Sequence, residues 1–491
     1  MTLACFKAYD IRGKVPDDLN ASLAYQIGSA LVAEFKPHNV VVGQDMRLES
    51  PEIASALMQG ILDAGADVLD IGLCGTEEVY FATQHYKAGA GVMVTASHNP
   101  KGYNGMKLVR EESKPISGDS GLFAIRDRVM RGEQHVATTQ GQVFVCPDKS
   151  AYIAHLLSYV DVTTLRPLKI LADPGNGMAG NVVKALAPHL PFEWVFIHDE
   201  PDGHFPNGVP NPLLPENRVM ASKAIVEHGC DLGLAWDGDF DRCFFYDAAG
   251  RFIEGYYLVG LLAESILKKY PGEKIIHDPR LTWNTIEQVR EAGGYPIVSK
   301  TGHAFIKERM RSENAIYGGE MSAHHYFREF AYCDSGMIPW LLITALMSQE
   351  NKTFADLVNE RLNAFPCSGE INYKVDNPER IIDLVETHFA HLNLIVDRTD
   401  GLSMEMAQVR FNIRLSNTEP LLRLNVEARE NALLMKDTLQ AIEQCIECSQ
   451  RMNTNKDNAL AAGQTPVGNE NGVRAPQICG EYNGPLAPET S

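Results

Sequence analysis

Three stretches of the chain share one pattern, an apolar run that ends in aspartate: Val40-Val41-Val42-Gly43-Gln44-Asp45, Lys169-Ile170-Leu171-Ala172-Asp173-Pro174 and Lys274-Ile275-Ile276-His277-Asp278-Pro279. Each run is short, β-prone and stopped by turn residues, which is typical of a strand buried on both faces. A helical stretch follows each run, and then comes a second apolar run, at Val68–Ile71, Trp194–Ile197 and Pro296–Val298. Alternating strands and helices predict parallel α/β layers, and the recurrence predicts that one unit is used three times.

The last part of the chain has a different pattern. From about Ser368 to Arg451, the segments 401–406, 410–414 and 422–428 alternate apolar and polar residues like antiparallel strands, with helical segments on either side. This block therefore predicts a smaller α+β domain. From Asn453 to Ser491 the sequence turns polar, with four prolines and five glycines, and it predicts a disordered extension.

Composition limits the possible functions. The 491 residues include 63 acidic and 44 basic side chains, a formal net charge of −19, which argues against nucleic acid or an anionic membrane as the main partner. The start of the chain has no apolar signal core, and no stretch approaches the roughly 18 apolar residues of a membrane span. The ten cysteines are scattered apart from Cys445 and Cys448, whose spacing favours helix packing over a redox pair. We therefore expect a soluble, cytoplasmic protein.

A serine follows the predicted strand Gly91–Val94, in the loop Thr95-Ala96-Ser97-His98-Asn99-Pro100. A hydroxyl exposed by a turn at the end of a strand is a typical nucleophile of α/β proteins, although a helix-capping serine is an equal alternative for this loop alone. His98 is expected to be a poor base for Ser97, because neighbours on an extended chain point to opposite sides.

An acidic loop, Asp237-Gly238-Asp239-Phe240-Asp241-Arg242, follows the predicted strand Leu232–Trp236. Three carboxylates at alternate positions can converge on one divalent cation, and Gly238 is expected to permit the turn. The spacing is not that of an EF-hand, since Arg242 stands at the sixth position of the loop. The alternative, solvated surface acids, fits less well directly after a buried strand.

A glycine pattern, Gly175-Asn176-Gly177-Met178-Ala179-Gly180, follows the second repeat's first strand, with Asp199 and Glu200 about twenty residues later. This spacing occurs in dinucleotide-binding folds, so a NAD-dependent dehydrogenase is one hypothesis. Asp173-Pro174 stands between the strand and the first glycine, which favours a tight turn instead.

Two further loops carry polar groups. The stretch Gly318-Gly319-Glu320-Met321-Ser322-Ala323-His324-His325 offers a carboxylate, a hydroxyl and imidazoles that can bind a polyol. The stretch Arg414-Leu415-Ser416-Asn417-Thr418-Glu419-Pro420, with Arg423 beyond it, offers the donors that a phosphate dianion requires.

Together, these loops closely resemble the α-D-phosphohexomutase superfamily, and the stretches Glu320-Met321-Ser322 and Ala323–Arg328 resemble its bacterial phosphomannomutases. The resemblance runs from Cys5 to about Val426. It implies three similar α/β domains with mixed sheets and a smaller α+β C-terminal domain around a central cleft. The expected boundaries are 1–152 for a phosphoserine domain, 153–255 for a metal-binding domain, 256–367 for a sugar-binding domain, 368–452 for a phosphate-binding domain and 453–491 for the tail.

The resemblance also implies roles for individual residues. Ser97 would carry a phosphoryl group, and Asp237, Asp239 and Asp241 would hold one Mg²⁺ together with a phosphate oxygen on Ser97. Arg12, Arg242 and Lys107 would be the nearby cations, and Lys107 and His324 would transfer protons. The expected substrate contacts are Tyr9, His98, Lys300, Glu320, Ser322 and His324, with Arg414, Ser416, Asn417, Thr418 and Arg423 on the phosphate that is not transferred.

The reaction implied by the resemblance is the interconversion of mannose 6-phosphate and mannose 1-phosphate, through a hexose 1,6-bisphosphate that also serves as activator, in the supply of GDP-mannose for polysaccharides. Glucose phosphates are the alternative substrates. A NAD-dependent dehydrogenase and a phosphatase that uses the acidic loop are the alternatives from other classes. We expect small sugar phosphates as the partners, no nucleic acid or membrane, and a monomer or homodimer.

Overall fold

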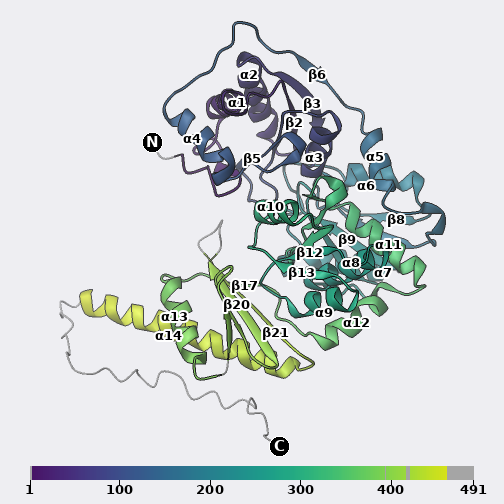
Figure 1. Cartoon of the computed structure of the whole chain (residues 1–491), viewed down its shortest axis with the longest axis vertical. Coiled ribbons are helices and arrows are strands. Elements are labelled where there is room, and N and C mark those ends of the chain that lie inside the picture. The colour runs from purple at the N-terminus through teal and green to yellow at the C-terminus, as the bar shows by residue number, and fades with distance from the viewer. Residues whose placement is uncertain (1–2, 393, 416–420, 462–491) are drawn as a thin grey trace, which may run out of the picture. The chain divides into compact units, whose positions relative to one another are not determined.

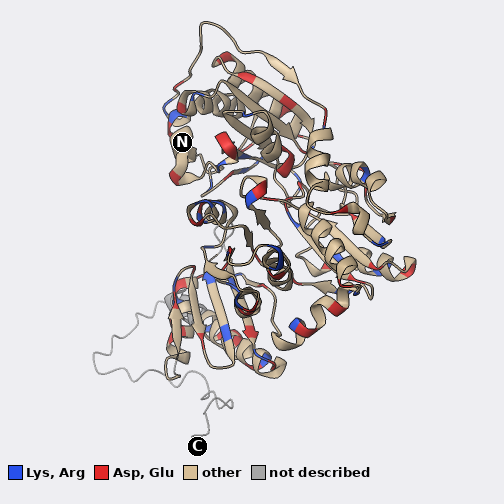
Figure 2. Cartoon of the chain, turned by 45° about the vertical axis from the view of Figure 1, so that its right-hand side comes forward, with Lys and Arg blue, Asp and Glu red and all other residues tan. Residues whose placement is uncertain are grey.

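The computed structural model describes residues 3–392, 394–415 and 421–461. These residues form two compact units, one made of the ranges Met1–Asp278 and Thr285–Asn359, the other of Pro279–Asn284 and the chain from Glu360 onward. Acidic and basic residues are spread over the elements of both units (Figure 2). No helix of the described residues combines the length and the apolar content that crossing a bilayer requires.

Three mixed sheets build the first unit (Figure 1). The first sheet belongs to the elements β1 (Ile11–Lys14), α1 (Ala21–Phe35), β2 (Asn39–Gln44), α2 (Ser50–Asp63), β3 (Asp67–Leu73), α3 (Thr76–His85), β4 (Ala90–Val94), β5 (Tyr103–Arg110), α4 (Phe123–Met130) and β6 (Val143–Val145). The second belongs to α5 (Ser150–Leu157), β7 (Lys169–Asp173), α6 (Ala179–Leu186), β8 (Glu193–Phe196), α7 (Val219–His228), β9 (Leu232–Trp236), β10 (Cys243–Asp247) and β11 (Phe252–Ile253). The third belongs to α8 (Gly255–Lys269), β12 (Lys274–His277), α9 (Trp283–Glu291), β13 (Tyr295–Val298), α10 (His303–Glu313), β14 (Tyr317–Gly319), β15 (His325–Phe327), β16 (Cys333–Asp334), α11 (Ile338–Gln349) and α12 (Phe354–Ala364).

The three sheets share four strands in the same order, β5-β4-β2-β3, β10-β9-β7-β8 and β15-β14-β12-β13, which confirms the predicted repeat. Their orders are β1-β5-β4-β2-β3-β6, β11-β10-β9-β7-β8 and β13-β12-β14-β15-β16. In each sheet the predicted apolar run is a central strand (β2, β7 or β12) with parallel neighbours on both sides, and the next strand, β5, β10 or β15, is antiparallel. A central parallel strand is covered by other layers on both faces, which is why these runs are apolar throughout.

Side chains of the first repeat show how the sequence builds these layers. Val40 and Val42 point into one buried cluster, with Leu57 of α2 and Ile27 of α1, while Val41 belongs to a second cluster on the other face of the sheet. Helix α1 begins where Asn20 accepts a hydrogen bond from the Leu23 amide at 3.0 Å.

The second unit is a sheet of antiparallel strands in the order β17-β21-β20-β19-β18. Its elements are β17 (Ile371–Tyr373), α13 (Pro378–Phe389), β18 (Ile395–Asp397), β19 (Leu402–Glu405), β20 (Val409–Leu415), β21 (Leu422–Ala428) and α14 (Ala432–Ala461). The predicted α+β domain is confirmed. Phe389 of α13, Phe411 of β20 and Cys445 of α14 share one buried cluster, so Cys445 packs in the core, as its spacing favoured.

Two local expectations are wrong. Gly318 and Gly319 lie in strand β14 rather than in a loop. The segment 453–461 continues helix α14 rather than starting a disordered extension, because the sequence reaches its first helix-breaking residues only at Gly463 and Pro466. The rest of the expected tail, residues 462–491, lies outside the described residues. Single-turn helices lie at η1 (Glu111–Ser113), η2 (Gly118–Leu122), η3 (Val162–Thr164), η4 (Ala187–His189), η5 (Pro215–Arg218) and η6 (Arg328–Phe330).

Candidate active site

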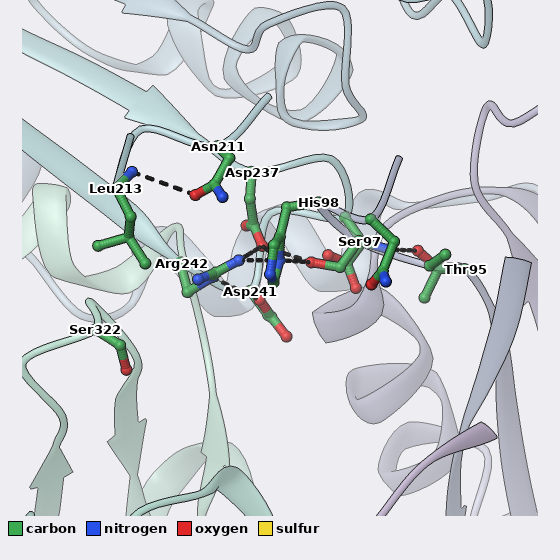
Figure 3. A network of polar contacts seen from close by, with 12 residues as sticks. Thr95, Ser97, His98, Asn211, Leu213, Asp237, Asp241, Arg242 and Ser322 are labelled. Atoms are coloured by element: carbon green, nitrogen blue, oxygen red, sulfur yellow. Dashed lines mark hydrogen bonds and ion pairs between the residues drawn. The ribbon is translucent and has the colours of Figure 1, made fainter. Parts of the chain in front are cut away.

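The three repeats each contribute the loop between their last parallel strand and the antiparallel strand that follows. These loops are 95–102 between β4 and β5, 237–242 between β9 and β10, and 320–324 between β14 and β15. They meet: Ser97 and His98 face Asp237 and Arg242 (Figure 3), and Arg242 also forms a backbone bridge with His324. Each loop thus occupies the same position in its own sheet, and the packing of the three repeats brings the serine, the acidic loop and the polyol loop together.

Ser97 lies against the acidic loop. Its Oγ donates to Asp237 Oδ2 at 2.7 Å, and its amide donates to Thr95 Oγ1 at 2.9 Å (Figure 3). The expected direction of the His98 side chain is wrong: its Nδ1 lies 3.0 Å from Ser97 Oγ. Arg242 Nη2 contacts the same nitrogen, and the expectation that His98 is a poor base stays a prediction. Ser97 has a φ of 49°, so the chain is not extended here and the two neighbours can turn to the same side.

The three carboxylates are buried, and each accepts side-chain hydrogen bonds through its Oδ2 atom. Arg242 donates from Nε and Nη2 to Asp237 Oδ2 at 2.9 and 2.7 Å. Lys107 Nζ donates to Asp239 Oδ2 at 2.6 Å and also to Asp241 Oδ2. The remaining Oδ1 atoms of all three aspartates have no hydrogen-bond partner among the described residues.

This donor set fits a divalent metal ion. One ligand atom from each of Asp237, Asp239 and Asp241 lies within 4.8 Å of the others. Burial raises the pKa of Asp237 to about 7, with Arg242 opposing the shift and the carboxylates of Asp241 and Asp239 adding to it. Three buried oxygens without donors and crowded negative charge are the conditions that a hard cation relieves.

The cations around the loop are fully engaged. Burial alone would lower the pKa of Lys107, but Asp239 and Asp241 outweigh it and raise that pKa above its usual value. Arg12 donates to the carbonyl of Ala96 at 2.8 Å and to the Asn99 side chain. Both groups are therefore protonated and lie beside the serine loop or the acidic loop.

Close packing of glycines fixes the acidic loop. A Cβ on Gly238 would lie 2.7 Å from the Ser97 carbonyl oxygen, and one on Gly177 would lie 2.9 Å from the Gly238 carbonyl oxygen. Gly238 is required for this close approach rather than for an unusual φ, since the left-handed residue of the loop is Phe240, with a φ of 44°. The glycine thus brings the metal-binding loop against the serine.

The glycine pattern of the second repeat supports this packing. The amides of Asn176, Gly177 and Met178 donate to the carbonyls of His198, Pro174 and Gly238, at 2.7, 2.8 and 3.0 Å. Asp199 pairs with Lys184 at 2.8 Å. The amides that a pyrophosphate would need are therefore occupied, which argues against the dehydrogenase hypothesis.

The polyol loop is held by its own polar groups. Glu320 accepts from the Gly302 amide at 2.9 Å and from the Tyr326 hydroxyl at 2.5 Å. Ser322 Oγ lies 3.2 Å from His324 Nδ1. Burial is the main reason why the pKa of His324 lies well below its usual value, so its imidazole is neutral. His324 Nε2 lies 3.7 Å from Asp241 Oδ1, which joins this loop to the acidic loop.

Two other predicted residues lie at the border between the first and third repeats. The half-buried Tyr9 packs edge-on against the His303 ring, with centroids 5.0 Å apart. Lys300 is exposed, three residues before this histidine. His303 was not among the predicted site residues, and its two ring nitrogens have no hydrogen-bond partner among the described residues.

The predicted phosphate clamp lies in the second unit. Arg414 and Arg423 are direct partners on β20 and β21, and both contact Glu370 at 3.2 Å. Ser416, Asn417 and Thr418 lie outside the described residues.

Sequence reasoning missed Thr76 and Arg47. Thr76, the first residue of α3, donates to Asp239 Oδ2 at 2.5 Å. Arg47 is 2% exposed, and its guanidinium donates to the carbonyls of Ser97, Asn99, Pro100 and Tyr103 at 2.6–3.1 Å. The sequence offered one signal for Arg47: it stands two residues after Asp45, which ends the first apolar run. Residues at this end of a parallel strand lie near the loops of the site.

Family models match all four parts of the chain. They are described as phosphoglucomutase/phosphomannomutase alpha/beta/alpha domains I, II and III, at residues 4–135, 150–250 and 254–365, and the C-terminal domain, at residues 370–442. The chain belongs to the phosphoglucomutase/phosphomannomutase family. The four-domain α/β architecture expected from the sequence is thereby confirmed.

Curated relatives and a solved structure agree with this family. The chain is 62% identical to "Phosphohexose mutases" of Xanthomonas campestris over 442 residues, which is 90% of this chain and 99% of that protein. It is 56% identical to a phosphomannomutase of Escherichia coli over 441 residues, 88% of this chain and 97% of that protein. A phosphoglucomutase/phosphomannomutase family protein of Burkholderia thailandensis superposes with a TM-score of 0.81 at 31% identity, covering 91% of this chain and 98% of that one.

Proposed function

We propose that this protein is a phosphohexomutase that interconverts mannose 6-phosphate and mannose 1-phosphate by way of a phosphorylated Ser97. The observation that carries the proposal is the position of Ser97 Oγ, 2.7 Å from a carboxylate of a buried triple-aspartate loop whose three Oδ1 atoms have no hydrogen-bond partner among the described residues. A hydroxyl beside three converging carboxylate oxygens fits phosphoryl transfer assisted by a metal ion. The choice of mannose as the sugar rests on the relatives that are described as phosphomannomutases.

Asp237, Asp239 and Asp241 are the residues that would hold Mg²⁺, with a phosphate oxygen on Ser97 completing the set. When bound, the ion supplies positive charge to the phosphoryl oxygens, whose charge must be balanced in a loose transition state. Arg12 and Arg242, which already flank the serine loop and the acidic loop, add to that balance.

The chain's residues then carry two transfers in opposite directions. In the first, the bond from phosphorus to Ser97 Oγ breaks and a bond to the sugar's 1-hydroxyl oxygen forms. The hydroxyl proton passes to a base, and the freed Ser97 oxygen takes up a proton from an acid. The hexose 1,6-bisphosphate then reverses its orientation and returns its 6-phosphoryl group to Ser97. We assign the acceptance of protons to the neutral imidazole of His324 and their donation to the ammonium of Lys107; both side chains contact Asp241.

The sugar and its second phosphate are assigned to other loops. Glu320 and Ser322 would bind the sugar hydroxyls, and Tyr9, His98 and Lys300 would add contacts to the substrate. Arg414 and Arg423, with Ser416, Asn417 and Thr418, would hold the phosphate that is not transferred. Two arginines paired across neighbouring strands support this assignment, because like charges in that position favour an anion between them.

Glucose phosphates are the second candidate substrates. The matching family models include phosphoglucomutases, and one relative carries the general description "Phosphohexose mutases". Because a carboxylate and a hydroxyl can bind either epimer of a sugar hydroxyl, the residues of the polyol loop fit both sugars. The ratio of kcat/KM for the two 1-phosphates, measured with the same enzyme, separates the candidates.

Intact-mass spectrometry and the Ser97→Ala variant test the phosphoserine. The wild type should carry the added mass of one phosphoryl group on Ser97 and lose it to added sugar phosphate. Ser97→Ala should lose more than about a thousandfold in kcat with an unchanged unfolding midpoint, while Ser158→Ala, at an exposed serine, should leave both unchanged. Full turnover by Ser97→Ala would refute the proposal, and release of inorganic phosphate without isomer formation would favour a phosphatase.

The cytoplasmic location, the monomeric or homodimeric state and the role of a bisphosphate activator stay predictions. Light scattering on the purified chain measures its oligomeric state. The dependence of the initial rate on added glucose 1,6-bisphosphate measures the effect of the activator.

A further inference from the structure

Three arginines surround one glutamate in the second unit. Arg414 and Arg423 stand directly opposite each other on β20 and β21. The third, Arg280, comes from the segment Pro279–Asn284, which is tied to the same sheet. Arg410 donates to the carbonyls of Pro279 and Arg280 at 2.5 and 2.9 Å. Hydrogen bonds thus hold the backbone at each of the three arginines.

Glu370 lies between them, directly before β17. Its Oε2 accepts from Arg280 Nη1 and Arg414 Nη2, both at 3.2 Å, and its Oε1 lies 3.2 Å from Arg423 Nη1. The Arg280 and Arg414 side chains are each 2% exposed and the Glu370 side chain 16%. Burial alone would raise the pKa of Glu370, but the three guanidinium groups outweigh it and lower that pKa, so the carboxylate is ionised.

The charges of this arginine triad and Glu370 sum to +2. That sum equals the charge of a phosphate dianion with opposite sign. Asp400 is a weaker contributor, because its Oδ2 lies 4.0 Å from Arg414 Nε, at the limit of an ion pair. Glu370 uses the same guanidinium N–H groups that a phosphate would use, so it competes with the phosphate as well as balancing the arginines.

We propose that Glu370 is a resident anion of the arginine triad: it keeps the three side chains together without substrate and weakens their hold on the bound phosphate. The inference rests on the proposed function, in which the bisphosphate must leave this clamp and reverse once per turnover. A clamp of three arginines without the carboxylate would hold the dianion too long. Glu370 is therefore a positioning residue that tunes release rather than a group that reacts.

The test compares the full-length wild type with Glu370→Gln and, as a matched control, Asp400→Asn. Calorimetry measures the binding of inorganic phosphate with a chelator present, so that the acidic loop holds no metal ion. Glu370→Gln should bind phosphate about tenfold more tightly, since one like charge next to a partly buried dianion is removed. Asp400→Asn should change the affinity by less than about twofold. Adding Arg423→Met to Glu370→Gln should abolish the gain, which places the phosphate at the triad.

Turnover gives the second measurement. Glu370→Gln should lower both KM and kcat, whereas a structural defect would raise KM and lower the unfolding midpoint. Equal or weaker phosphate binding by a folded Glu370→Gln overturns the inference. If that variant does not fold, Glu370→Asp, which withdraws the charge, should show a smaller gain, and wild-type affinity there overturns the inference. Tighter phosphate binding in a protein without mutase activity would support the role of Glu370 and refute the proposed function instead.

Discussion

Replacing Arg47 by lysine should loosen the serine loop, because one guanidinium binds three carbonyls of this loop and the carbonyl of Tyr103, which follows it. Nη1 donates to Pro100 and Tyr103 at 3.1 and 3.0 Å, and Nη2 to Ser97 and Asn99 at 2.8 and 2.6 Å. A lysine ammonium keeps the charge but lacks the planar fork, so it can serve about two of the four carbonyls. At about 1.5–3 kcal/mol for each hydrogen bond to a charged group, Arg47→Lys should lower the free energy of unfolding by about 3–6 kcal/mol.

The same loss should reach catalysis. The Ser97 carbonyl belongs to the residue whose Oγ faces Asp237, and a displacement of about 1 Å at a reacting group lowers the rate by about a hundredfold. We therefore expect kcat to fall by one to two orders of magnitude while KM changes little, since Arg47 is buried and its guanidinium donates to the segment 97–103, which precedes the predicted sugar contacts.

Urea unfolding and steady-state kinetics on the same preparations measure both effects. Arg47 lies over the ring of Phe205 and beside Asp45. Arg126→Lys is the matched control, because Arg126 likewise lies over a phenylalanine and pairs with an acid but is 32% exposed. Its effect on unfolding should stay below about 0.5 kcal/mol. If Arg47→Lys unfolds at the wild-type urea concentration and keeps its kcat, the carbonyl clamp does not position Ser97.

Two further predictions concern buried carboxylates of the first unit. Asp239→Asn should lower kcat at least about a hundredfold and shift the Mg²⁺ activation curve to higher concentration, because it removes one of three ligands; an unchanged curve would place the metal elsewhere. Glu77 accepts from Tyr152, Ser335, Gly336 and Met337, and burial raises its pKa from 4.5 to about 8. Between these values the folded chain keeps a proton that the unfolded chain has released, so stability should fall, by on the order of a few kcal/mol, as pH rises from about 4.5 to 8. Glu77→Gln should flatten that slope in urea titrations across the range, and an unchanged slope would exclude Glu77 as its source.

Much of the first unit could be predicted because its signals are local. The buried strands are continuous apolar runs, and the loops that end them carry Ser97, the three aspartates and His324 in sequence order. Once the runs are interpreted as repeats, parallel pairing brings the loop ends to one edge. The acidic loop and the serine lie on different sheets, however, so their contact was expected only from the resemblance to the phosphohexomutases.

The details that escaped prediction depend on backbone angles and on contacts distant in sequence. The positive φ of Ser97, which turns His98 toward it, carries no signal in the residue type, because serine rarely adopts that region. Gly238 resembles a turn glycine in the sequence, but the contact that requires it comes from Ser97, 141 positions earlier. Thr76 reaches Asp239 across a similar separation. No local pattern encodes such pairs.

The charges show why the site is divided among the repeats. The acidic loop alone would bury three negative charges with Arg242 as its own cation, and burial of unpaired charge costs several kcal/mol for each ion. Lys107, from β5 of the first repeat, supplies the contact to Asp239 and Asp241, and His324 of the third repeat closes the loop from the other side. The cost of burying these carboxylates is offset only when the first repeat packs on the second and brings Lys107 to them. The packing of the repeats therefore also forms the site. Three aspartates, Lys107 and Arg242 together leave a charge of −1, and this remaining negative charge favours the binding of a cation.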